Sequence, residues 1–178
     1  MAVDAALEDL VRPAAFLSVF VAMAVWEIFA PKRAQSTGRS SRWPSNLGIV
    51  ALNSVLVRAV FPLTAVAWAD TIAQQGFGLL NLLAVPSLGA AIAAFVLLDL
   101  AIYLQHRLFH AVPAFWRLHR MHHADTEFDV TNGLRFHPLE IGLSMLIKFA
   151  VIAALGAPAW SVLVFEIVLN ATSIFNHA

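Results

Sequence analysis

Residues 95–110 read "FVLLDLAIYLQHRLFH" and join two kinds of sequence that together point to one architecture. The apolar residues close a run over 86–105, which is long enough to cross a bilayer as a helix of about 17–25 residues. The run ends in His106 and His110, which are four residues apart and lie on one face of a continuous helix. The stretch therefore predicts a membrane helix that delivers two imidazoles to the membrane boundary.

The same helix face carries two further polar side chains upstream of the histidines, Asp99 and Tyr103. Polar groups near the end of a membrane helix are costly in lipid, so this stripe should face the protein interior or a cavity. A carboxylate in such a place can accept a hydrogen bond from an imidazole and fix its tautomer. We therefore expect Asp99 and Tyr103 to support histidines that bind a metal.

The composition of the 178-residue chain is typical of a membrane protein, because 60% of its residues are hydrophobic and 12% are charged. A soluble domain has about 45–50% apolar and about 25% charged residues, and a small core cannot hide the excess found here. The formal net charge of zero gives no reason to expect nucleic acid as a partner. Because the chain has no cysteine, any metal site must use nitrogen and oxygen ligands.

Apolar runs predict an all-α integral membrane bundle with three spans, over residues 14–30, 47–69 and 86–105. Basic loops mark the cytoplasmic side of a membrane protein. Segments 31–46 and 106–137 are both basic, whereas 70–85 contains one acid and no base. An N-terminus on the outside satisfies this pattern and puts the histidine-rich helical segment on the cytoplasmic face.

The last apolar region is divided by "GAPA" at 156–159 into runs over 141–155 and 159–175. A helix over 141–155 would measure about 22 Å at 1.5 Å per residue, which is less than the hydrocarbon core of about 30 Å. We therefore expect a helical hairpin that enters the membrane and turns at 156–158. Its second helix returns His177 to the cytoplasmic face.

A second histidine cluster, "HRMHH", places His119, His122 and His123 at spacings that put all three imidazoles on one helical turn. Pro113 lies between the two clusters, and proline disfavours helical backbone at the residue before it. The chain should therefore bend after His110 and fold the second cluster back toward the first.

Two further histidines, His137 in "LRFHPLE" and His177 in "IFNHA", complete the seven histidines of the chain. The predicted layout brings all seven to one face of the membrane. One metal ion rarely needs more than four imidazoles, so seven suggest two ions. The spacing alone does not choose among iron, zinc and copper, since imidazole suits all three.

Residues 99–140, "DLAIYLQHRLFHAVPAFWRLHRMHHADTEFDVTNGLRFHPLE", resemble the core of the fatty acid hydroxylase/sterol desaturase superfamily. The motifs "YxxHRxxH", "WxxHxxHH" and "RFHPxE" occur here in the order typical of that family. The remainder of the chain is similar in its membrane layout only.

This resemblance implies a membrane-bound non-haem di-iron oxygenase, with zinc as a possible substitute for iron. It implies O₂, a membrane lipid substrate that is hydroxylated or desaturated, and an external electron donor resembling cytochrome b5 or ferredoxin. The metal ligands that it implies are His106, His110, His119, His122, His123, His137 and His177.

The resemblance also implies a last HxxHH box beyond the "NH" motif, and the sequence ends at Ala178, directly after His177. We therefore expect a core that is truncated before that box, and we expect this chain alone to be inactive. Two parts follow from the motifs: N-terminal transmembrane helices over 1–105 and a histidine-box catalytic core over 106–178.

Other classes of function remain open on the sequence alone. A zinc-dependent membrane hydrolase would use Glu140 or Asp125 as the general base that activates a metal-bound water. A haem-binding electron carrier would need histidines that face one another inside the bilayer, and the three predicted spans contain none before His106. A catalytically inactive remnant that only binds a partner is the last alternative.

Overall fold

The structure, a computed structural model, describes residues 3–31 and 35–178. Lys32 and Arg33, which contribute to the basic segment 31–46, lie outside these residues. The elements in chain order are α1 Ala5–Phe29, α2 Arg39–Val60, α3 Ala65–Gln74, α4 Leu79–Leu82, α5 Ser87–Ala111, α6 Pro113–His119, the 3-10 turn η1 Asn132–Leu134, α7 Pro138–Leu155 and α8 Ala159–His177. The described part of the chain contains no strand, which confirms the predicted all-α class.

Five helical segments are long and apolar enough to cross a membrane. Four of them are the helices α1, α5, α7 and α8, and the fifth is the segment Arg39–Leu82, which begins with α2. Their outer faces carry large apolar side chains that remain exposed, among them Leu17, Val21, Leu104 and Leu146. A soluble protein would bury such side chains, whereas lipid is a favourable surrounding for them. The membrane bundle predicted from composition is therefore confirmed, and both helices of the hairpin count among the five segments.

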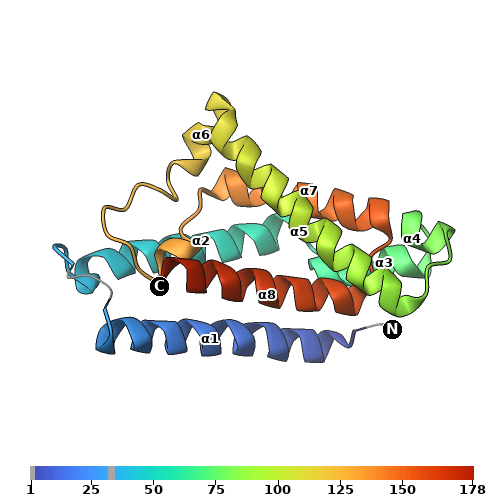
Figure 1. The fold of residues 1–178 in the computed structure, drawn as a ribbon, viewed down its shortest axis with the longest axis horizontal. Coiled ribbons are helices and arrows are strands. Elements are labelled where there is room, and N and C mark those ends of the chain that lie inside the picture. The colour runs from blue at the N-terminus through green and yellow to red at the C-terminus, as the bar shows by residue number, and fades with distance from the viewer. Residues whose placement is uncertain (1–2, 32–34) are drawn as a thin grey trace.

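The helix α8 lies at the centre of the bundle, where it packs against α1, α3 and α5. Figure 1 shows α1 alongside α8, with α5 running obliquely to them and carrying α6 at its far end, and α2 packs against α7 and η1. The end of α1, the start of α2, η1 and the end of α8 lie at one end of the bundle. The start of α2 and the loop between α6 and η1 thus share one end, and α3, α4 and the turn between α7 and α8 lie at the other.

The predicted run over 47–69 differs from the structure, because its helix breaks at residues 61–64 and α3 follows α2 as a separate helix. Pro62 explains the break, since the residue before a proline is pushed out of the helical region. That residue, Phe61, has φ −112° and ψ 99° and ends α2. The second span is therefore a bent segment and not one straight helix.

The hairpin turns where the sequence predicts it, at Gly156, which adopts a left-handed conformation with φ 68° and ends α7. This turn packs tightly against Gly78, where an added Cβ would lie 2.2 Å from the Gly156 nitrogen. However, α7 begins at Pro138, earlier than the predicted 141, and its 18 residues span about 27 Å. Proline is favoured at the first helical position, which explains the earlier start.

A buried ion network joins three of the long helices away from the histidines. Glu166 on α8 accepts a hydrogen bond of 2.6 Å from Lys148 on α7 and lies 2.9 Å from a guanidinium nitrogen of Arg12 on α1. Arg12 also pairs with Glu8 at 2.7 Å. Charges inside membrane proteins face the protein interior and pair with one another, as these do.

Candidate metal centre

The last turns of α5 present the first histidine pair. The Nε2 atoms of His106 and His110 lie 3.2 Å apart, as expected for residues four apart on one helix face. The helix ends at Ala111, Val112 is extended with φ −98° and ψ 119°, and Pro113 starts α6. The predicted bend at Pro113 therefore exists, and it turns the chain back over the end of α5.

The bend brings the second cluster onto the first. The imidazole of His119 lies 4.7 Å, between ring centroids, from those of both His106 and His110. One candidate ligand nitrogen from each of these three residues lies within 4.8 Å of the others. The Nε2 atoms of His119 and His123 are 3.2 Å apart. Four histidines from α5, α6 and the turn that follows α6 thus converge on one small region, although the helix ends at His119 and the expected single helical turn over 119–123 does not form.

A third pair joins residues that are 55 positions apart in the sequence. The Nε2 atoms of His122 and His177 lie 3.2 Å from each other, and the ring of His123 lies 4.8 Å from that of His122. His177 sits on the last turn of α8. Six of the seven histidines are therefore in one continuous cluster.

Hydrogen bonds at Nδ1 fix the tautomers of two histidines of the cluster, His119 and His177. The Nδ1 of His119 lies 2.6 Å from Oε1 of Glu140, and the Nδ1 of His177 lies 2.7 Å from the carbonyl oxygen of Ser173. Because a carboxylate and a carbonyl accept hydrogen bonds, each Nδ1 carries a proton, so that in the neutral ring Nε2 keeps the free lone pair. Lone pairs that converge at such distances fit a bound cation, so the residues present suit a metal.

Burial, followed by the neighbouring imidazoles of His177, His123 and His119, lowers the pKa of His122 from 6.5 to about 3. Burial is also the largest cause of the lowered pKa of His123. Both rings are therefore neutral near pH 7, which is the protonation state that a metal requires of a histidine ligand.

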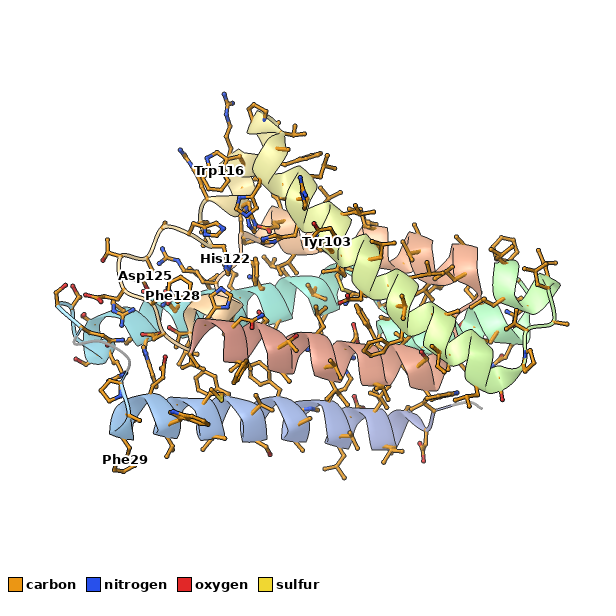
Figure 2. The ribbon with its side chains drawn as sticks, in the orientation of Figure 1. Phe29, Tyr103, Trp116, His122, Asp125 and Phe128 are labelled. Carbon is orange, nitrogen blue, oxygen red and sulfur yellow. The ribbon has the colours of Figure 1, made fainter. Side chains whose placement is uncertain are left out.

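Aromatic side chains surround the cluster. Phe136 stacks on His122 with ring centroids 4.5 Å apart and an interplanar angle of 6°, and Phe128 stacks on His177 at 5.2 Å and 12°. Trp116 packs against two histidine rings at 5.4 and 5.7 Å. Figure 2 shows Trp116, His122 and Phe128 at the same end of the bundle. Phe136 is half-buried, whereas Phe128 and Trp116 are exposed at 53% and 38%, so the aromatic cover of the imidazoles is partial.

The loop between α6 and η1 is tied to α2 by buried polar contacts. Arg42 pairs with Asp125 at 3.1 Å and with Asp129 at 2.5 Å, and Asp129 is fully buried. Asn46 donates a hydrogen bond of 2.9 Å to the hydroxyl of Thr131. The loop that separates His123 from η1 is therefore held in place by the second membrane segment.

The remaining predicted site residues lie apart from the cluster. The Nδ1 of His137 accepts a hydrogen bond of 3.2 Å from the backbone nitrogen of Leu139 and caps α7. The Tyr103 hydroxyl accepts a hydrogen bond of 3.3 Å from Arg107, and Asp99 is exposed on α5. Within residues 3–31 and 35–178 no hydrogen bond joins Asp99 or Tyr103 to a histidine, so their supporting role stays a prediction.

The carboxylate that does contact a histidine is Glu140, for which sequence reasoning considered only the role of general base in a hydrolase. Both partners are buried, with side-chain exposures of 0% for His119 and 4% for Glu140. The sequence feature that could have indicated the position of Glu140 is Pro138, because proline at a helix start places Glu140 in the first turn of α7. The direction in which that turn faces depends on the packing of α7 against α5 and α6.

The cluster opens to the exterior on the side of α5. A shallow hollow of about 350 Å³ is lined by His106, Arg107, His110 and Ala111. Leu104 and Leu108, which are both about half exposed, lie on the same helix beside it. The opening therefore borders an apolar helix surface.

A comparison with models of known protein families gives a match. Residues 91–178 match the family model described as fatty acid hydroxylase, and this segment runs from α5 to the end of α8 and contains all seven histidines. No curated protein and no solved structure matches the chain. The family match and the motifs agree, and the segment 91–178 of this membrane protein belongs to the fatty acid hydroxylase family, within the fatty acid hydroxylase/sterol desaturase superfamily.

Proposed function

We propose that the protein is a membrane-bound non-haem di-iron oxygenase that uses O₂ to oxidise a C–H bond of a membrane lipid, by hydroxylation or desaturation. The observation that carries this proposal is the set of three Nε2–Nε2 pairs at 3.2 Å, formed by six imidazoles. The family match supports an oxidoreductase of the lipid hydroxylase/desaturase type.

Two metal positions suit the cluster. His106, His110 and His119 would hold one ion, and His122 and His177 would contribute to a second, with His123 between the two groups. Imidazole ligands suit iron, and zinc could occupy the same positions as a substitute. Bound iron would supply the oxidising power that an unactivated C–H bond requires, given O₂ and electrons from a donor resembling cytochrome b5 or ferredoxin.

The side chains around the metal positions would orient the ligands and shield the reaction. Glu140 holds the His119 ring in one tautomer, which also raises the basicity of the ligand nitrogen. Phe128, Phe136 and Trp116 partly cover the imidazoles and reduce the access of water. A lipid chain could approach along the apolar surface of α5, where the hollow beside His106 opens.

We further propose that the histidine cluster lies on the cytoplasmic side of the membrane. Segments 31–46 and 106–137 are both basic, and the start of α2 contacts the loop after the cluster through Arg42 and Asp125, while positive charge favours the cytoplasmic side. A soluble electron donor could reach the cluster from that side.

The candidate bases of the zinc hydrolase hypothesis are engaged only in part. Glu140 is hydrogen-bonded to His119, and Asp125 is paired with Arg42 at 3.1 Å. These contacts occupy Oε1 of Glu140 and Oδ2 of Asp125, whereas Oε2 of Glu140 has no hydrogen-bond partner among the described residues and keeps the lone pairs that a general base needs.

The reaction can be tested by expressing the protein from its own gene in cells and analysing lipid extracts by mass spectrometry under ¹⁸O₂. A hydroxylase should give a lipid that carries one ¹⁸O atom, and a desaturase should give a lipid lighter by two hydrogens. Neither product should form with His122→Ala, whereas Arg117→Ala, at an exposed residue, serves as the matched control. A product whose new oxygen comes from water would overturn the oxygenase proposal.

A further inference from the structure

The 3-10 turn η1 lies directly against the last turn of α8, and Gly133 is the residue at the contact. Figure 1 shows η1 beside the end of α8. Gly133 is buried, and a Cβ added there would lie 2.7 Å from the carbonyl oxygen of Ser173 and 3.2 Å from Nδ1 of His177. A Cβ essentially never approaches another heavy atom to less than 3.0 Å. No other residue type therefore fits between η1 and α8 at the present separation.

The need for glycine arises from space and not from backbone conformation. The glycines with positive φ among residues 3–31 and 35–178 are Gly76, Gly78 and Gly156, and Gly133 is not one of them. An alanine at 133 could therefore adopt the same backbone angles. It would meet the backbone oxygen of a helix, which cannot move aside as a flexible side chain can.

The atom that an added Cβ would displace is the one that orients His177. The Ser173 carbonyl accepts the hydrogen bond from His177 Nδ1 at 2.7 Å. The Ser173 hydroxyl in turn donates a hydrogen bond of 2.9 Å to the carbonyl oxygen of Gly133. The turn η1, Ser173 and His177 thus form one closely packed unit.

A movement of η1 away from α8 would also disturb His122, which is the partner of His177 in the third histidine pair. Upstream of η1, Thr131 is hydrogen-bonded to Asn46 on α2. Downstream, Phe136 stacks on His122 at 4.5 Å. A displacement of η1 would therefore move the ring that covers His122 as well as the backbone that supports His177.

We propose that Gly133 is a positioning residue that sets the approach of His177 to His122, and with it the second metal position. This inference rests on the proposed metal function. His106, His110 and His119 belong to α5 and α6, and no hydrogen bond joins them to η1 within the described part of the chain. The two halves of the cluster can therefore be separated by a substitution at 133.

The test is a Co²⁺ titration of the purified chain in lipid nanodiscs, followed by metal analysis and by the visible absorption of the bound Co²⁺. We expect about two Co²⁺ ions for the unchanged protein, since six imidazoles are more than one ion uses. Gly133→Ala should still bind the tighter Co²⁺ ion. It should bind the second ion about 10–100-fold more weakly, which is the loss typical when a metal ligand loses its supporting hydrogen-bond partner. The absorption bands of the second ion should disappear. Gly142→Ala is the matched control, because an added Cβ there meets nothing within 4 Å.

A second pair of variants keeps the inference testable if Gly133→Ala fails to fold. Ser173→Ala removes the hydroxyl that bonds to Gly133 and should weaken and alter the same Co²⁺ signal, whereas Ser173→Thr keeps a hydroxyl and should restore it. Two unchanged Co²⁺ ions in both Gly133→Ala and Ser173→Ala would overturn the role of Gly133 alone. Absence of Co²⁺ binding by the unchanged protein would instead overturn the proposed metal function.

Discussion

His119 and Glu140 are joined by a hydrogen bond of 2.6 Å between Nδ1 and Oε1, although they lie on different helices and are 21 positions apart. The second oxygen of Glu140, Oε2, is buried and has no hydrogen-bond partner among the described residues. The carboxylate is therefore committed to one imidazole, which it holds with its Nε2 lone pair facing His123. Partners of this kind raise the affinity of a histidine for metal.

Replacing Glu140 with Gln should weaken metal binding about 10–100-fold, because the amide keeps an acceptor but loses the negative charge that raises the basicity of His119. The affinity can be measured by competition with a chelator of known affinity. Asp70→Asn is the control, since Asp70 contacts Gln74 at the opposite end of the bundle. An equal affinity in Glu140→Gln and the unchanged protein would show that the hydrogen bond does not tune the site.

His137 offers a test that separates the role of ligand from the role of helix cap. The structure uses its Nδ1 to accept a hydrogen bond from the Leu139 nitrogen at the start of α7. Asn is a good capping residue, so His137→Asn should keep both the stability and the metal content. His137→Ala should lose about 1 kcal/mol of stability, as measured by denaturant unfolding. A fall in metal content in His137→Asn would instead establish the ligand role that the family resemblance implies.

Features that depend on helix periodicity were predictable from the sequence. His106 and His110 share a face because they are four residues apart, and the bend at Pro113 follows from the geometry of proline. The return of His177 to the cluster follows from the turn at Gly156. Each of these results needs only a few neighbouring residues.

Features that depend on packing between distant segments could not be predicted. The pairing of His122 with His177 joins residues 55 positions apart, and the contact of Arg42 with Asp129 joins residues 87 positions apart. Both require the relative placement of α2, η1 and α8, which no local pattern encodes. For the same reason Asp99 was the predicted partner of the histidines, whereas Glu140 contacts His119.

The orientation of the protein in the membrane can be tested with single cysteines, because the chain has none of its own. Ser40, Thr126 and Gln74 are exposed. Cysteines at Ser40 and Thr126 should react with an impermeant maleimide only from the cytoplasmic side, since both belong to basic segments. A cysteine at Gln74 should react only from the outside. Labelling of Ser40 and Thr126 from opposite sides would contradict the proposed cytoplasmic side of both segments.

The pairing of Arg42 with two aspartates should stabilise the loop before η1. Asp129 is fully buried and also accepts a hydrogen bond of 3.1 Å from the Trp43 indole. Arg42→Ala would leave a buried carboxylate without its cation, which typically costs about 3–5 kcal/mol. Unfolding in denaturant, followed by circular dichroism, measures this loss. Arg117→Ala, at an exposed arginine, should stay within about 0.5 kcal/mol, and equal stabilities for the two variants would refute this account of the loop.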